Sequence, residues 1–140
     1  MALEVSRVDT WAASLEDQPG GLAAKLEALS AAGVNLEFMI ARRAPERPGT
    51  GVVFVTPIKG APQVRAAAAV GFSRSESLHT VRVEGPDRPG LAARLTKAIA
   101  AKGINLRGFS AAAIGHKFVA HIAVDTSADA TALARVLRAA

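Results

Sequence analysis

Residues 17–36 read DQPGGLAAKLEALSAAGVNL, and residues 87–106 read DRPGLAARLTKAIAAKGINL. The two stretches lie 70 positions apart, and 9 of their 20 positions are identical without a gap. The chain has 140 residues, which is twice this offset, so two copies of one unit account for nearly all of it. The sequence therefore predicts a tandem repeat in place of a single larger domain.

The second copy predicts the element order strand, helix, strand, strand, helix. Apolar and polar residues alternate over Thr80–Glu84, as expected for a strand. Apolar residues then recur at helical spacing from Gly90 to Lys102, and Gly103 follows as a glycine that ends the helix. The remaining pattern predicts strands at Ile104–Ile114 and Lys117–Val124, a turn at Gly115-His116, and a helix from Ser127 onward.

The first copy predicts the same elements in the same order. Leu22, Leu26 and Leu29 share one helical face, and a loop rich in Pro and Gly separates two apolar strands. The predicted elements are strand Thr10–Leu15, helix Gly20–Ala32, strand Val34–Ile40, loop Ala44–Gly51, strand Val52–Pro57, helix Pro62–Val70 and strand Phe72–Leu78.

The N-terminal strand decides how the two copies connect. Ala2–Val8 lies 70 positions before Phe72–Leu78, and the second copy has no fourth strand after its last helix. We therefore expect strand 2–8 to complete the second unit, so that the units are permuted and interlocked. The predicted fold class is α+β, with two ferredoxin-like βαββαβ units and antiparallel four-stranded sheets. The predicted domains are 9–78 and 79–140, with strand 2–8 contributed to the second.

The composition excludes several classes of protein. Half of the residues are hydrophobic, which suits a folded core, and Cys is absent, which excludes disulfides, thiol nucleophiles and zinc–cysteine clusters. No apolar run reaches the roughly 18–20 residues of a membrane span, and no signal-peptide pattern is present, so a cytoplasmic protein is expected. The net charge of +5 falls in the second half of the chain alone, which is weak support for a nucleic-acid partner.

The repeated motif resembles one known family. Asp-x-Pro-Gly, an amphipathic helix, and Gly-[Val/Ile]-Asn-Leu together resemble the ACT domain family, in both copies and over nearly the whole chain. That family comprises small βαββαβ regulatory modules, which pair their sheets and bind small effectors, commonly amino acids. The resemblance implies a non-catalytic protein without cofactor or metal that binds an amino acid between its two units. It also implies a regulated enzyme or transcriptional regulator as partner, and free sheet edges allow a homodimer.

The loops suggest how an amino acid would bind. Each loop leads to free backbone N–H groups at a helix start, which favour a carboxylate, and Asp17 and Asp87 can accept from an ammonium group. Gly21 stands where the second copy has a leucine, which predicts extra room in the first loop. The resemblance implies that strand residues next to the loops also contact the ligand. The predicted ligand-binding residues are Asp17, Gln18, Pro19, Gly20, Gly21, Val34, Asn35 and Leu36, and Asp87, Arg88, Pro89, Gly90, Leu91, Ile104, Asn105 and Leu106.

Other readings stay open. Asp-x-Pro-Gly can serve only as a turn and helix cap, which would leave a dimerisation module without ligand. The predicted central strands offer Trp11, Phe54 and Phe118 for base stacking, but no basic and aromatic signature surrounds them, so nucleic-acid binding is disfavoured. The three histidines, His79, His116 and His121, share no metal-ligand spacing, and no nucleophile motif accompanies them, so an enzyme is disfavoured too.

Overall fold

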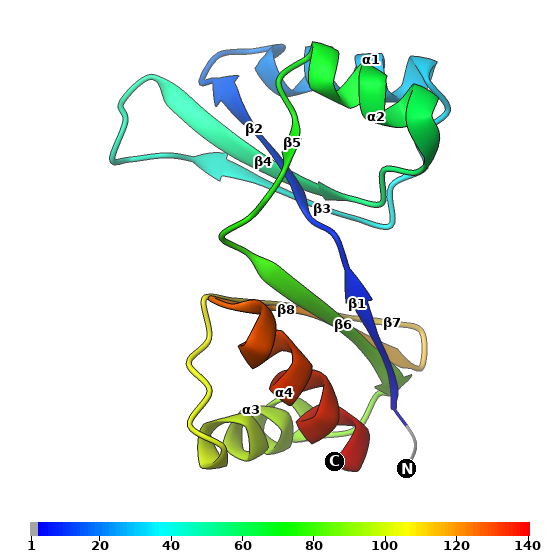
Figure 1. Ribbon diagram of the computed structural model, residues 1–140, viewed down its shortest axis with the longest axis vertical. Coiled ribbons are helices and arrows are strands. Elements are labelled where there is room, and N and C mark those ends of the chain that lie inside the picture. Colours follow the sequence, from blue (N-terminus) through cyan, green and yellow to red (C-terminus); the bar gives the residue numbers. More distant parts are fainter. Residues whose placement is uncertain (1–2) are drawn as a thin grey trace. The chain divides into compact units, whose positions relative to one another are not determined.

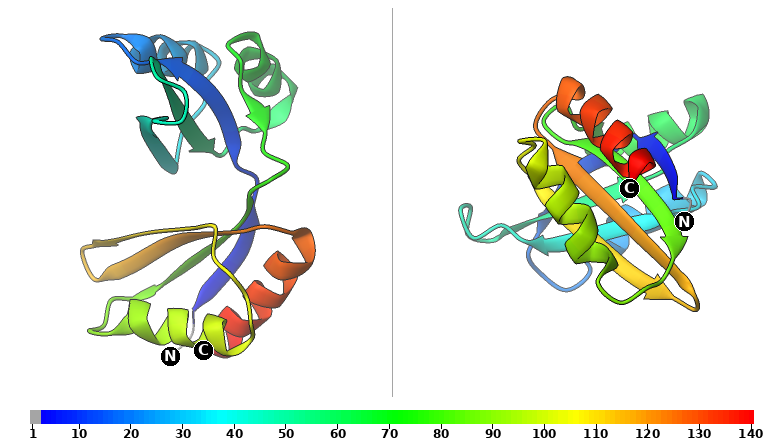
Figure 2. Two further views of the ribbon diagram at one scale, coloured as in Figure 1. Left: turned by 90° about the vertical axis from the view of Figure 1, so that its left-hand side faces the viewer. Right: turned by 90° about the horizontal axis from the view of Figure 1, so that it is seen from below.

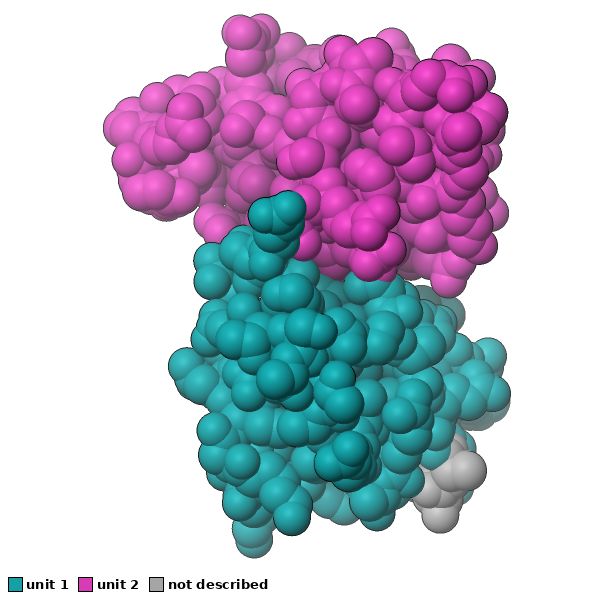
Figure 3. All heavy atoms as spheres, in the orientation of Figure 1, with its two compact units in different colours: residues 1–8, 76–140 teal, residues 9–75 magenta. Residues whose placement is uncertain are grey.

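The computed structural model describes residues 3–140 as two compact units. Unit 1 comprises the chain up to Val8 together with Glu76–Ala140, and unit 2 comprises Asp9–Ser75 (Figure 3). Unit 2 thus holds the first sequence copy, and unit 1 holds the second. Each unit has one four-stranded antiparallel sheet, which confirms the predicted α+β class.

Unit 1 is a βαββαβ arrangement with the strand order β1-β6-β8-β7 (Figure 1). Both of its helices cover one face of the sheet, as Figure 2 shows. Its elements are β1 (Glu4–Val8), β6 (His79–Pro86), α3 (Leu91–Ala101), β7 (Gly108–Ile114), β8 (Lys117–Val124) and α4 (Ser127–Ala139).

The N-terminal strand joins the sheet of the second copy, as predicted. β1 pairs antiparallel with β6, from Glu4 opposite Glu84 to Val8 opposite Thr80. The predicted strand began at Ala2, which lies outside the described residues. Since β2 follows β1 directly but belongs to the other sheet, the two units are interlocked by the chain path.

Unit 2 repeats this arrangement with the strand order β3-β4-β2-β5. Its helices again share one face of the sheet (Figure 2). Its elements are β2 (Trp11–Glu16), α1 (Gly21–Ala31), β3 (Phe38–Arg43), β4 (Thr50–Thr56), α2 (Gly60–Ala69) and β5 (Ser73–Arg74). Most predicted boundaries are correct to within two residues, and three strand predictions need correction.

The predicted strand Phe72–Leu78 was too long. β5 contains only Ser73 and Arg74, which pair with Ala12 and Trp11 of β2. Phe72 is turned into the core and is 3% exposed. The residues after Arg74 are mostly polar and small, and they offer no apolar face that would hold them on the sheet.

The predicted strands at Val34 and Ile104 begin four residues later, at Phe38 and Gly108. The chain first closes each helix: Gly33 adopts φ 80°, and the Val34 N–H donates to the Leu29 carbonyl at 3.1 Å. The Gly33 N–H also donates to the Ser30 carbonyl at 3.0 Å. This pair of bonds around a left-handed glycine is a Schellman motif, and unit 1 repeats it with Gly103 and Ile104. The residues after each glycine therefore form a loop, and Asn35 and Asn105 do not start the strands.

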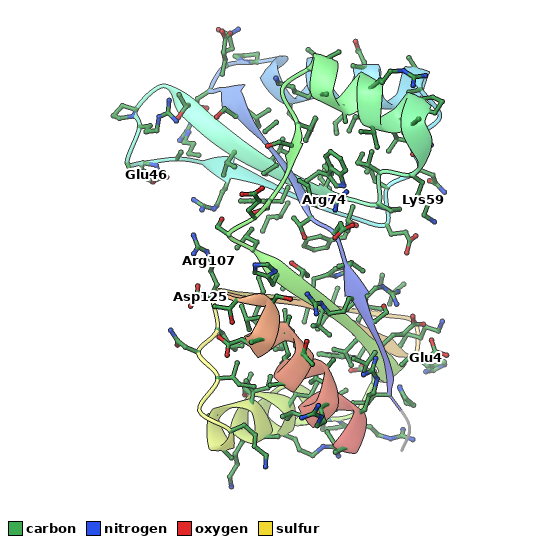
Figure 4. The ribbon with its side chains drawn as sticks, in the orientation of Figure 1. Glu4, Glu46, Lys59, Arg74, Arg107 and Asp125 are labelled. Atoms are coloured by element: carbon green, nitrogen blue, oxygen red, sulfur yellow. The ribbon has the colours of Figure 1, made fainter. Side chains whose placement is uncertain are left out.

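Each unit has its own hydrophobic core between the sheet and the helices. The core of unit 1 includes Val83, Leu95 and Ile122, which are completely buried. The core of unit 2 is smaller and includes Trp11, Leu29 and Val55. Charged pairs lie outside the cores, for example Arg107 and Asp125, whose Nη1 and Oδ1 atoms are 3.3 Å apart (Figure 4).

Candidate functional site

The two Asp-x-Pro-Gly loops are built by backbone hydrogen bonds. Gly20 and Gly90 adopt φ values of 86° and 78°, a left-handed conformation that favours glycine, and α1 and α3 begin directly after them. The Gly21 N–H donates to the Gln18 carbonyl, and the Leu91 N–H donates to the Arg88 carbonyl. No side chain caps either helix. Neither aspartate therefore acts as the helix cap that was considered for a module without ligand.

Each helix start leaves backbone donors open. Within residues 3–140, the N–H groups of Leu22 and Ala23 in α1 have no acceptor, and the same holds for Ala92 and Ala93 in α3. Such groups sit at the positive end of the helix dipole. Both loops can therefore accept an anion through backbone atoms alone.

The loops also contact the hairpins of their own units. The Asp17 N–H donates to the Gly49 carbonyl at 3.1 Å, and the Asp87 N–H donates to the His116 carbonyl at 2.8 Å. In unit 2 the Asp17 carboxylate additionally accepts from Nε of Arg43 at 2.8 Å. Sequence reasoning did not identify Arg43, because the residue 70 positions later is Ala113 and the repeat gives no signal there.

The predicted site residues fall into two groups in each unit. Residues 17–21 lie at the start of α1, whereas Val34, Asn35 and Leu36 follow its end. The helix has 11 residues, so its ends lie about 16 Å apart at 1.5 Å per residue. Unit 1 repeats the separation, with residues 87–91 at one end of α3 and Ile104, Asn105 and Leu106 beyond the other.

A pocket of about 190 Å³ opens beside the first loop, and we call it the Gly51 pocket. Leu15, Leu22, Ala41 and Gly51 form its apolar part, and the polar groups come from Glu16, Asp17, Gln18, Arg42 and Arg43. It brings two predicted residues, Asp17 and Gln18, together with the unpredicted Arg43. The pocket combines a carboxylate, a guanidinium and an apolar surface in one place.

Gly21 has a different role from the predicted one. A Cβ atom on Gly21 would lie 2.3 Å from the carbonyl oxygen of Glu16, far closer than atoms can approach. Gly21 therefore permits close packing of α1 against the end of β2, and the predicted extra room at this position is filled by backbone.

A second pocket of about 490 Å³ lies at the other end of α1. Val34 and Leu36 line it with Leu26, Leu29 and Met39, and Ser30 and Glu37 are its polar members. It thus contains two of the predicted residues of the second group, and its character is mainly apolar.

A charged cluster marks the sheet of unit 1 on the side away from its helices. Glu84 accepts from Nη1 of Arg82 at 2.8 Å, and Nζ of Lys117 lies 2.5 Å from its other oxygen. The hydrogen bond from Lys117, followed by that from Arg82, lowers the pKa of Glu84, and Glu84 in turn raises the pKa of Lys117. The cluster pairs β6 with β8 and holds its groups in their charged forms.

The other readings receive little support from the described part of the chain. Trp11 and Phe118 are each 7% exposed and belong to the two cores, so two of the three aromatics considered for base stacking are not accessible. Within residues 3–140, no three His, Asp or Glu side chains come together as metal ligands would. No helix over the same residues is long and apolar enough to span a membrane.

Comparison with known proteins connects this geometry to a family. The family model of the ACT domain matches residues 79–140, which lie in unit 1. No curated protein matches the sequence. Among solved structures, protein BT0572 from Bacteroides thetaiotaomicron superposes with a TM-score of 0.77 at 16% identity, over 94% of this chain and 88% of that one.

Two other solved structures have the same fold. The ligand-free regulatory subunit of aspartate kinase from Thermus thermophilus gives a TM-score of 0.66 at 19% identity, over 100% of this chain and 97% of that one. Aspartokinase III from E. coli, in complex with aspartate and ADP, gives 0.60 at 14% identity, over 98% of this chain and 32% of that one. Identities this low establish the fold and nothing finer. Residues 79–140 thus match the ACT domain family, and unit 2 repeats the strand order of unit 1 as a second, ACT-like unit.

Proposed function

We propose that the chain is a non-catalytic regulatory protein that binds an amino acid at an Asp-x-Pro-Gly loop and passes this state to a partner protein. One observation carries the proposal: each loop holds an aspartate beside helix N–H groups that lack an acceptor within residues 3–140. An α-amino acid carries an anion and a cation a few ångströms apart. The N–H groups suit its carboxylate, and Asp17 or Asp87 suits its ammonium group.

The structural relatives are consistent with this role. One of them is the regulatory subunit of an aspartate kinase, and another is an aspartokinase in complex with aspartate. A regulatory role requires a ligand that favours one state of the protein and a partner that distinguishes the states. The partner we propose is an enzyme or a transcriptional regulator.

Titration calorimetry with each of the twenty standard amino acids tests the proposal on the full chain. We expect saturable binding of at least one of them, with a rise in the thermal unfolding temperature when that ligand is in excess. A chain that responds to none of the twenty by either measurement rejects the proposal and leaves a pairing module without ligand.

Loop variants then test the proposed contacts. Asp17→Asn and Asp87→Asn keep the shape of the side chain and remove its charge, so at least one of them should weaken binding about tenfold or more. Asp9→Asn is the matched control, because Asp9 lies outside both loops and is exposed near Arg74. Binding that survives both loop variants, or that the control weakens equally, contradicts a role for these carboxylates.

A further inference from the structure

The register of the two sheets reveals which residues correspond in space. Leu15 and Gly51 stand opposite each other in unit 2, and Gly85 and Phe118 do so in unit 1. Leu15 and Gly85 are 70 positions apart, so Gly51 occupies the place in unit 2 that Phe118 occupies in unit 1. The neighbouring strand agrees, because Gly51 also pairs with Arg43, and Phe118 with Ala113.

The two units fill this place differently. In unit 1, Phe118 and Leu91 are 7% and 3% exposed and belong to the core. In unit 2 the equivalent residues are Gly51 and Gly21, and both lie close to neighbouring backbone: an added Cβ atom would lie 2.8 Å from the Arg42 carbonyl oxygen and 2.3 Å from that of Glu16, respectively. Directly opposite residues of a β-ladder point to the same face, so Gly51 lies on the helix-covered face together with the core residue Leu15. The Gly51 pocket therefore lies beside the position at which unit 1 has the buried Phe118 side chain.

The polar groups of the Gly51 pocket are arranged for a zwitterion. Arg43 uses its Nε to bind Asp17, and its terminal N–H groups have no acceptor within residues 3–140. A guanidinium has five N–H donors, so these remain available to a carboxylate. One oxygen of Asp17 is likewise not used by Arg43, and it can accept from an ammonium group.

The volume limits the size of the ligand. The pocket has about 190 Å³, and pockets for drug-sized molecules have roughly 300–1,000 Å³. Besides Asp17 and Arg43, the charged residues Glu16 and Arg42 line the pocket, so its lining does not select for or against a charged side chain. A small amino acid fits the volume.

Resting on the proposed function, we propose that the two units are not equivalent and that unit 2 alone binds the amino acid, with its small side chain in the Gly51 pocket. Arg43 contacts the carboxylate, Asp17 contacts the ammonium group, and the side chain lies in the pocket beside Gly51. Unit 1 lacks this site because Ala113 stands at the place of Arg43 and the buried Phe118 stands at the place of Gly51.

A matched pair of variants tests which unit binds. Ala41→Leu narrows the Gly51 pocket, and Ala111→Leu makes the same change at the equivalent position of unit 1. Both alanines are exposed on edge strands, where a larger side chain does not disturb the core. Calorimetry with the tightest-binding of the twenty amino acids should give one site per chain, a loss of about tenfold or more in Ala41→Leu, and an unchanged Kd in Ala111→Leu.

A second pair of variants tests the role of the Arg43 guanidinium. Arg43→Ala introduces the residue that unit 1 has at this place, and it should weaken binding about tenfold or more. Arg88→Ala removes the arginine of the unit 1 loop and should leave the Kd unchanged. Circular dichroism of all four variants, before titration, verifies that each is folded.

The outcomes separate this inference from the proposed function. If the unmodified chain binds none of the twenty amino acids, the proposed function fails. If it binds but Ala111→Leu or Arg88→Ala causes the loss, the function stands and the assignment to unit 2 is overturned. Binding that is unchanged in all four variants, or two equal sites per chain, also overturns the assignment. Preference for an amino acid with a large side chain overturns the role of the Gly51 pocket.

Discussion

The two units share a strand order but fill it with different side chains. Leu95 of α3 is completely buried, whereas the corresponding residue of α1 is Lys25, whose ammonium group donates to the Val70 carbonyl at the end of α2. A cation near a helix C-terminus is favourable, so Lys25 joins the two helices by a polar contact. The comparison teaches that this topology tolerates an open, partly polar packing in one copy while the other keeps a dense core.

The units also differ at their edges. β1 pairs with β6 over five residues, whereas β5 pairs with β2 over two. α4 has 13 residues and a side-chain cap, whereas α2 has 10 residues and none. Fewer buried contacts and shorter pairing lower the cost of local opening, so we expect unit 2 to open more readily than unit 1. The single tryptophan, Trp11, lies in the core of unit 2 and reports on that unit alone.

The largest expected effect contrasts the two helices at equivalent positions. Leu95→Ala should lower the free energy of unfolding by about 2–5 kcal/mol, because it leaves a cavity in a completely buried site. Lys25→Ala should cost only about 1 kcal/mol, the usual contribution of one hydrogen bond. Urea denaturation followed by circular dichroism and by Trp11 fluorescence measures both. Equal losses in the two variants would contradict the difference in packing.

A smaller effect concerns the helix starts of α4 and α2. The Thr126 hydroxyl accepts from the Asp129 N–H at 3.0 Å, so Thr126→Ala should cost about 1 kcal/mol. Lys59 holds the equivalent position before α2 in an extended conformation without a cap, so Lys59→Asp should stabilise unit 2 by about 0.5–1 kcal/mol. Urea denaturation again measures the changes. A destabilised Lys59→Asp chain would show that the position does not act as a helix cap.

The smallest expected effect is a dependence on pH that belongs to unit 1. Lys117 and Arg82 lower the pKa of Glu84 below its ordinary value of 4.5, so the ion pairs stabilise the fold above pH 4.5 and are lost as the pH falls through the lowered pKa. Glu84→Gln removes this dependence. The difference in unfolding free energy between the unmodified protein and Glu84→Gln should therefore shrink on acidification from pH 7 to pH 3. A difference that stays constant over this range would contradict the assignment.

The periodicity of the sequence was sufficient to predict the element order and the crossing of β1 into the other sheet. Alternating apolar residues and helix-ending glycines are local signals, and Gly33 and Gly103 have the predicted conformation. The starts of β3 and β7 were missed because Val34 and Ile104 are apolar like strand residues, but their N–H groups close the preceding helices. The predicted length of β5 was wrong although the signal was local, because the residues after Arg74 are mostly polar and offer no apolar face.

The Gly51 pocket could not be predicted, because the repeat loses its register at the hairpin. The first hairpin is three residues longer than the second: Arg43 pairs with Gly51 eight positions later, and Ala113 pairs with Phe118 five positions later. At the offset of 70, Gly51 aligns with His121, which hides its correspondence to Phe118. Only the pairing of the strands shows that a glycine replaces a core aromatic.

The strand exchange has a consequence for how the protein forms during synthesis. Unit 2 is continuous from Asp9 to Ser75, so it is complete before most of unit 1 has been translated. β1 is translated before unit 2 but pairs with β6, which follows about 70 residues later, so it has no partner strand until unit 2 has been translated. The strand therefore waits for its sheet while unit 2 folds behind it.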